Sequence, residues 1–226
     1  MQTDLFTKFQ KEFQLNGSPE RAKSMSAYMR NQFDYFGISS PKRKELQKKL
    51  FPSKLAFTSS DIEEFVLQCW DQDQREWKYL AMDFSRKYLK KGQLELLDLF
   101  ERLITDQSWW DTVDCITPNI IAKILKPYPQ KLKEKQLSWI ESDNIWLQRS
   151  AIIIQLMFKE DTDFTLLKDL ILRRAGSKEF FIQKASGWSL RQYSKTNPGA
   201  VVDFINSNTL APLTKREGLR LMLPKK

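Results

Sequence analysis

A tryptophan and a carboxylate stand four residues apart in segment 108–114, which reads SWWDTVD. The segment begins a helical pattern, and residues i and i+4 share one face of an α-helix. We therefore expect Trp110 and Asp114 to project side by side. A carboxylate beside an indole is poorly suited to a hydrophobic core, but it is well suited to stabilise a positive charge that develops on a substrate.

Two later segments add a guanidinium and a second indole. Arg149 falls within the first two turns of a helix that opens at Asp143, and Trp188 follows Gly187 in the middle of another predicted helix. Glycine at such a position costs about 1 kcal/mol relative to alanine, so we expect another group to approach the backbone closely there. Tyr28 lies in a further polar and aromatic segment near the amino-terminal end.

Trp110, Arg149 and Trp188 belong to successive predicted helix pairs, and equivalent helices of a stacked array line one wall. A shared functional patch is one interpretation. Structural roles remain open: tryptophan often fills a core, an aspartate such as Asp111 often complements the helix dipole, and an arginine often pairs with a surface acid. We assign four other tryptophans to the core: Trp70, Trp77, Trp139 and Trp146.

Composition excludes many kinds of chemistry. The 226 residues include no histidine, which removes histidine-based nucleophilic and general-base catalysis and most zinc or iron sites. Seven glycines form neither a dinucleotide-binding fingerprint nor a phosphate-binding loop. We expect no metal and no cofactor, so carboxylates, arginine, tyrosine and tryptophan must carry any reaction.

Charge and segment type suggest a cytoplasmic protein with a polyanionic partner. Lysine and arginine number 37 against 28 acidic residues, giving a net charge of +9. The polar first fifteen residues do not resemble a signal peptide, and no apolar run is long enough to span a membrane. Cys69 and Cys115 form no zinc or disulfide pattern, and we expect both to be core thiols.

The elements that position these residues are predicted to be helices throughout. Apolar residues recur at three- and four-residue spacing, and breaks such as Ser18-Pro19 and Ser40-Pro41 read as caps followed by proline at the first helical position. Aromatic-led helices recur at spacings of about 33–37 residues, typical of helix–turn–helix repeats. We predict an all-α, HEAT-like solenoid of antiparallel helix pairs, forming one domain over residues 1–226 with a concave face.

The chain resembles the AlkD-type DNA alkylation repair proteins, which are HEAT-like-repeat DNA glycosylases. The resemblance is collinear over nearly the whole chain. Its segments are 28–33 (YMRNQF), 36–38 (FGI), 108–114 (SWWDTVD), 142–149 (SDNIWLQR), 177–185 (SKEFFIQKA), 187–188 (GW), 195–198 (KTNP) and 210–217 (LAPLTKRE).

The resemblance implies roles for single residues. Asp114 matches the family's catalytic carboxylate, and Trp110 and Trp188 match indoles that contact the lesion nucleotide. Arg149 matches an arginine that supports the carboxylate and the DNA backbone, and Tyr28 matches a tyrosine near the lesion. We expect further DNA contacts from a set of aromatic and basic residues: Trp109, Lys178, Lys184, Arg191, Lys215 and Arg216.

The implied activity is a monofunctional glycosylase that removes cationic N3- or N7-alkylated purines from double-stranded DNA. Such a base is already an activated leaving group and needs no strong general acid, which suits a chain without histidine. We expect a monomer in the bacterial cytoplasm, bound to the nucleoid through DNA, that works without enclosing a flipped base. Two alternatives remain: a non-catalytic DNA-binding solenoid, and a protein-interaction scaffold whose inner wall carries no net positive charge.

Overall fold

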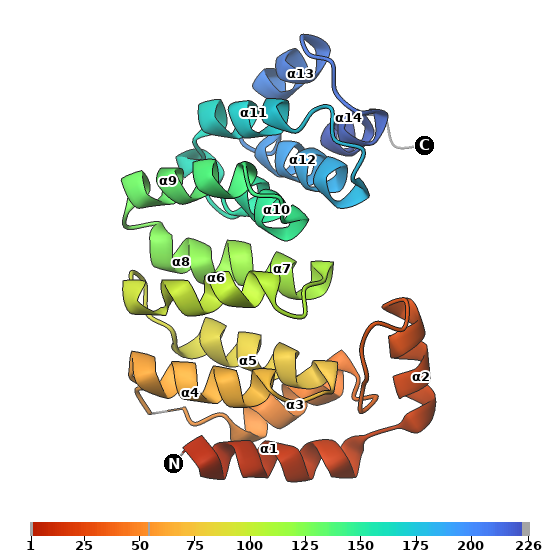
Figure 1. The fold of residues 1–226 in the computed structure, drawn as a ribbon, viewed down its shortest axis with the longest axis vertical. Coiled ribbons are helices and arrows are strands. Elements are labelled where there is room, and N and C mark those ends of the chain that lie inside the picture. Colours follow the sequence, from red (N-terminus) through yellow and green to blue (C-terminus); the bar gives the residue numbers. More distant parts are fainter. Residues whose placement is uncertain (1, 54, 223–226) are drawn as a thin grey trace. The chain divides into compact units, whose positions relative to one another are not determined.

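A computed structural model describes residues 2–53 and 55–222, and every regular element in these ranges is helical (Figure 1). The predicted all-α helical-repeat fold is therefore confirmed. The chain divides into two compact units, Met1–Lys90 and Lys91–Lys226. A single domain over the whole chain and a concave DNA-binding face both stay predictions.

The first unit has an aromatic core. Its helices are α1 (Gln2–Asn16), α2 (Pro19–Tyr28), α3 (Ser40–Leu50), α4 (Ser59–Trp70) and α5 (Arg75–Tyr88). Helix α1 packs against α3 and α4, and α4 packs against α5. Phe6 stacks on Trp77 with ring centroids 4.6 Å apart, and Phe13 lies 4.8 Å from the same indole. Aromatic pairs of this kind add about 0.5–1.5 kcal/mol beyond area burial.

A buried carboxylate in the first unit holds the segment that follows α2. Glu76 accepts hydrogen bonds from the backbone N–H groups of Phe36, Gly37 and Ile38 at 2.9–3.1 Å. Gly37 has a φ of 84°, and a Cβ there would lie 2.1 Å from the Ser18 carbonyl oxygen, so only glycine fits. Segment 36–38 is thus positioned by packing and by backbone hydrogen bonds.

The predicted helix caps are confirmed at one proline and shifted by one residue at another. Ser18 caps α2 and accepts from the Arg21 N–H, with Pro19 in the first turn. In α3 the cap is Ser39, one residue earlier than predicted, because its hydroxyl accepts from the Lys42 N–H three residues on. Ser40 is then the first helical residue.

The second unit consists of stacked helix pairs (Figure 1). The elements are η1 (Leu94–Leu96), α6 (Leu97–Thr105), α7 (Trp110–Ile116), η2 (Thr117–Ile121), α8 (Ala122–Leu125), α9 (Pro129–Ile140), α10 (Ile145–Ile153), η3 (Lys159–Asp161), α11 (Phe164–Arg173), α12 (Phe180–Tyr193), α13 (Pro198–Asn206) and α14 (Pro212–Leu219). Helix α7 packs on α10, α10 on α12, and α12 on α14, so the second helices of successive pairs form one continuous layer.

A π-helical turn, η2, interrupts the helix that carries Asp114. Pro118 lies inside this turn, and an interior proline lacks an N–H and clashes with the carbonyl four residues earlier, here that of Asp114. The wider turn accommodates the ring, and the Ala122 N–H bonds the Thr117 carbonyl five residues back. Such turns are frequent at functional sites. The sequence contained the signal, Thr117-Pro118 within an apolar helix, and our sequence analysis missed it.

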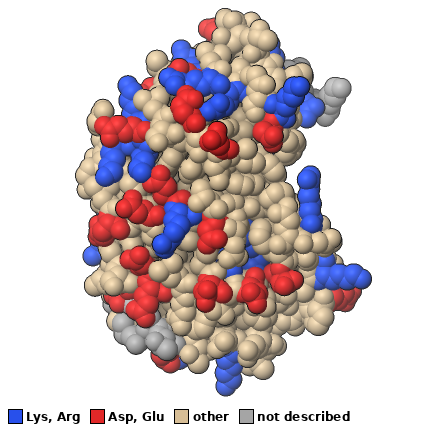
Figure 2. All heavy atoms as spheres, viewed as in Figure 1, with Lys and Arg blue, Asp and Glu red and all other residues tan. Residues whose placement is uncertain are grey.

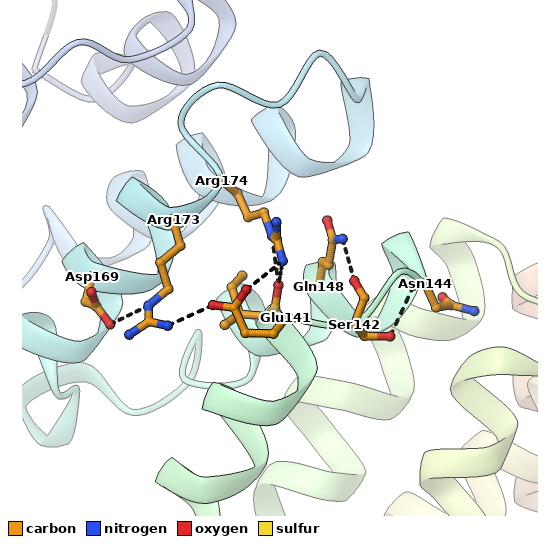
Figure 3. A network of polar contacts seen from close by, with 8 residues as sticks. Glu141, Ser142, Asn144, Gln148, Asp169, Arg173 and Arg174 are labelled. Atoms are coloured by element: carbon orange, nitrogen blue, oxygen red, sulfur yellow. Dashed lines mark hydrogen bonds and ion pairs between the residues drawn. The ribbon is translucent and has the colours of Figure 1, made fainter.

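Two turns of the helical repeat have the same hydrogen bonds at equivalent positions. The Ser142 hydroxyl accepts from the Asn144 N–H, and the Gln148 side chain returns to the Ser142 carbonyl (Figure 3). Ser177, 35 residues later (177 minus 142), has the same two bonds from the residues two and six positions on. These matched turns align the starts of α10 and α12.

The remaining expectations about the core are mostly confirmed. The four tryptophans assigned to the core are buried: Trp70, Trp77, Trp139 and Trp146. Cys69 is a buried free thiol, but Cys115 is only half-buried, so the prediction of a core thiol was wrong there. Within residues 2–53 and 55–222, no helix combines the length and apolar character needed to cross a bilayer.

Candidate active site

Asp114 of α7 and Arg149 of α10 form a bidentate ion pair. Arg149 Nε donates to Asp114 Oδ1 and Arg149 Nη2 donates to Oδ2, both at 2.7 Å. Arg149 Nη1 donates to the Phe181 carbonyl oxygen of α12 at 2.5 Å, so three helices meet at one guanidinium. Bidentate geometry of this kind fixes the orientation of both partners.

The two members of the pair differ in exposure. The Arg149 side chain is 5% exposed, whereas that of Asp114 is 19% exposed. The arginine therefore lies behind the carboxylate, and the carboxylate retains an open edge. A hydrogen bond of 2.8 Å between the hydroxyls of Thr117 and Ser150 links α10 to η2, the π-helical turn that continues α7. Both contacts hold α7 and α10 in register.

Burial raises the pKa of the Asp114 carboxyl above its ordinary value of 3.8. The two hydrogen bonds and the positive charge of Arg149 act in the opposite direction, and the nearby charge of Asp111 adds to the rise. Loss of hydration outweighs the attraction because the carboxylate exchanges water for only one cationic group. Asp114 thus combines a raised pKa with partial exposure, and perturbed pKa values are common among functional residues.

An aromatic cluster packs beside Arg149. The rings of Trp109, Trp146 and Phe181 lie 4.9–5.7 Å apart in three pairwise contacts, and Arg149 lies 5.9 Å from the Phe181 centroid. The Trp109 indole N–H is buried without a hydrogen-bond partner among the described residues. That loss costs about 1–3 kcal/mol, which the two ring contacts of Trp109 can offset. Trp109 is half-buried and its ring packs against Trp146 and Phe181, and its predicted contact with DNA stays a prediction.

Comparison with known proteins agrees with the resemblance. Residues 9–222 match the family described as DNA alkylation repair enzyme. The chain belongs to this family. A solved structure described as a predicted DNA alkylation repair enzyme from Enterococcus faecalis is similar, with a TM-score of 0.85 and 34% identity over 93% of this chain and 98% of that one. No curated protein matches the chain.

In this member of the DNA alkylation repair enzyme family, the two predicted site indoles lie on α7 and α12. Trp110 is the first residue of α7, one turn before Asp114, as the four-residue spacing predicted. Trp188 lies on α12, seven residues after Phe181 and therefore on the same face. Both indoles are half-buried, so each combines a packed edge with an accessible one.

The close approach predicted at Gly187 is confirmed, and the approaching group is α14. A Cβ at residue 187 would lie 2.5 Å from Glu217 Cβ and 3.0 Å from the Thr214 carbonyl oxygen. The glycine therefore permits helix packing. The Thr214 hydroxyl also donates to the Gln183 carbonyl at 3.1 Å, which fixes the register of α14 on α12.

The predicted DNA-binding residues divide into paired and exposed groups. Lys184 and Arg191 both bond Glu217, at 2.9 and 2.7 Å. Tyr28 is 74% exposed at the end of α2 in the first unit. Lys178 and Arg216 are exposed and Lys215 is half-buried.

The family resemblance implied that Arg149 supports the carboxylate, and the structure shows that contact, but sequence reasoning did not identify the role of Phe181. A signal was present: Asp114 and Arg149 are 35 residues apart, the same interval that separates Ser142 from Ser177. They thus occupy equivalent positions in neighbouring repeats. Among the described residues, no group of three or more histidine, cysteine, aspartate or glutamate side chains is placed to hold a metal ion.

Proposed function

We propose that the protein is a monofunctional DNA glycosylase that hydrolyses the N-glycosidic bond of cationic N3- or N7-alkylated purines in duplex DNA. Membership of the DNA alkylation repair enzyme family supports a role in alkylation repair. The observation that carries the finer proposal is the half-open Asp114 carboxylate, oriented from behind by buried Arg149.

The geometry leaves Asp114 free to act on a substrate. An ionised carboxylate offers about four lone-pair sites, and Arg149 occupies one on each oxygen. The remaining sites can face a deoxyribose and a water molecule. Because Arg149 is also held by the Phe181 carbonyl, the carboxylate needs little reorganisation when charge develops.

The proposed reaction balances without a cofactor. The glycosidic bond breaks first, and its electron pair neutralises the cationic purine. Positive charge passes to the sugar as an oxocarbenium ion, which the Asp114 carboxylate stabilises. Water then adds to the anomeric carbon and loses its proton to Asp114 or to solvent. No lysine forms a covalent intermediate, hence the assignment as monofunctional.

The indoles of Trp110 and Trp188 supply a further attraction to the cationic sugar. Each cation–π contact is worth about 0.5–2 kcal/mol, depending on desolvation. We propose that both contact the lesion nucleotide at its sugar and backbone while the base stays stacked. Selectivity then follows from the lability of the lesion, and bulky cationic adducts are substrates where neutral uracil is not.

Binding to DNA is proposed to depend on phosphate contacts and to be independent of sequence. The net charge of +9 favours a polyanion. On the face shown in Figure 2, acidic side chains are interspersed among the basic ones, so the basic side chains form no continuous patch there. Local clusters of basic residues are therefore more informative than net charge. We propose that the protein acts as a monomer in the cytoplasm.

The decisive test is single-turnover release of 7-methylguanine from methylated duplex by Asp114→Asn. The variant keeps the size of the side chain but removes its charge, and loss of one preorganised electrostatic partner costs about 100-fold or more. Asp111→Asn is the matched control on the same helix and is expected to stay within the same order of magnitude as the wild type.

Three outcomes would contradict the proposal in different ways. Wild-type rates in Asp114→Asn would remove the role given to this carboxylate. Duplex binding without base release by the wild type would favour a non-catalytic DNA-binding protein. Absence of both binding and release would favour a protein-interaction scaffold.

A further inference from the structure

A second carboxylate, on α14, gathers two cationic side chains of α12. Glu217 Oε1 accepts from Lys184 Nζ at 2.9 Å, and Glu217 Oε2 accepts from Arg191 Nη1 at 2.7 Å. Lys184 and Arg191 are seven residues apart, which is about 10.5 Å along a helix axis. Their charged ends nevertheless converge on the two oxygens of one carboxylate. The cluster therefore presents a single cationic centre.

The carboxylate lies behind its cations. The Glu217 side chain is 11% exposed, against 37% for Lys184 and 22% for Arg191. Its stem is pinned against the α12 backbone, since a Cβ at Gly187 would meet Glu217 Cβ at 2.5 Å. The packing of α14 on α12 therefore fixes the position of the Glu217 Cβ. It supports the cations from below and does not compete for an incoming anion.

The cluster retains both charge and donors. Two cations and one carboxylate leave a net charge of +1, and Arg220 adds to the positive field around Glu217. An ammonium has three donors and a guanidinium has five, and each group uses one on Glu217. The remaining donors belong to the more exposed side chains, where a tetrahedral oxyanion can reach them.

The cluster also adjoins one of the proposed lesion-contacting indoles. Trp188 follows Lys184 by four residues and precedes Arg191 by three, so all three share a face of α12. A nucleotide whose sugar contacts Trp188 has its own phosphate or a neighbouring one within reach of the cluster. We propose that Lys184 and Arg191, preorganised by Glu217, form a binding site for one DNA phosphodiester, and that Glu217 is its positioning residue. This inference rests on DNA being the substrate of the proposed function.

The proposal makes a prediction opposite to that of simple electrostatics. Removing a negative charge from a DNA-binding protein should strengthen binding, whereas removing a positioning carboxylate should weaken it. We expect Glu217→Gln in the full chain to bind undamaged duplex roughly threefold or more weakly, with the log–log salt slope reduced by about one. Fluorescence anisotropy across a salt series measures both quantities.

Glu141→Gln is a matched control. Glu141 also bonds two cations, Arg173 and Arg174, but these three residues lie at the ends of α9 and α11, whereas Trp188 lies on α12 (Figure 3). Its loss should leave duplex affinity unchanged or slightly raised and the salt slope unaltered. Lys184→Gln, which leaves Glu217 and Arg191 in place, should reduce the slope by about one. It tests the site even if Glu217→Gln proves unfolded by circular dichroism.

The results separate this inference from the proposed function. Weaker binding and a smaller slope in Glu217→Gln and Lys184→Gln, with Glu141→Gln unaffected, would support the phosphate site. Unchanged or stronger binding by folded Glu217→Gln, or an unchanged slope in Lys184→Gln, would overturn it. Wild-type protein that binds no duplex would instead overturn the proposed function itself.

Discussion

Two carboxylates in the second unit are each held by basic side chains, yet their ionisation is shifted in opposite directions. Burial raises the pKa of Asp114, despite two bonds from Arg149. The hydrogen bond from Lys184 is the main cause that lowers the pKa of Glu217, and the charges of Lys184, Arg191 and Arg220 act in the same direction. Pairing with basic side chains therefore accompanies a raised pKa at Asp114 and a lowered pKa at Glu217.

The difference follows from where the cations lie. Arg149 is buried behind Asp114, so both charges lose water and the carboxylate keeps an accessible edge. The cations of Glu217 lie outside it and remain partly hydrated, so they stabilise its ionised form at less cost. The first arrangement suits a reacting carboxylate, and the second suits one that positions other groups.

The largest expected difference in stability comes from removing one arginine at each site. Arg149→Ala leaves the largely buried Asp114 carboxylate without the cation that pairs with it and should cost about 3–5 kcal/mol of unfolding free energy. Arg191→Ala leaves Glu217 bonded to Lys184 and should cost less than about 1 kcal/mol. Urea unfolding monitored by circular dichroism measures both, and equal losses would contradict the distinction.

Closing the space beneath Glu217 should have an intermediate effect. Gly187→Ala places a methyl group 2.5 Å from Glu217 Cβ, and overpacking of this kind costs about 1–3 kcal/mol. Gly176→Ala is the control, because a Cβ there meets no atom within 4 Å. A Gly187→Ala protein with wild-type stability and wild-type duplex affinity would show that the close packing of Glu217 against α12 is unimportant for both properties.

The smallest effects are in the pH dependence of stability, and their signs should be opposite. Asp114 has a raised folded-state pKa. Its contribution to folding stability is therefore present below pH 3.8 and is lost as pH rises through the folded-state pKa. Glu217 has a lowered pKa, so its contribution is present above 4.5 and is lost as pH falls through the folded-state pKa.

Comparing wild type with Asp114→Asn and Glu217→Gln across this range isolates each carboxylate. The stability advantage of wild type over Asp114→Asn should shrink as pH rises above 3.8. Its advantage over Glu217→Gln should grow as pH rises toward 4.5. If both stability differences changed with pH in the same direction, the opposite pKa shifts assigned to Asp114 and Glu217 would be wrong.

Much of the fold was predictable from local patterns. Three- and four-residue spacing indicated helices, serine before proline indicated caps, and Gly187 indicated a close approach. The length of the repeat was less clear from the sequence, because the aromatic residues at helix starts vary by a few positions. The matching turns at Ser142 and Ser177 lie 35 residues apart. The π-helical turn at Pro118 was missed because apolar periodicity continues through it.

The sequence by itself determined which residues share a helix face, since that follows from 3.6 residues per turn. It placed Trp110 beside Asp114, and the spacing of Lys184, Trp188 and Arg191 already puts these three on one face. Tertiary structure alone decided that Arg149 bonds Asp114 and that Glu217 lies beneath two cations. Those contacts join separate helices, and their effect on ionisation depends on how much water the packed helices exclude.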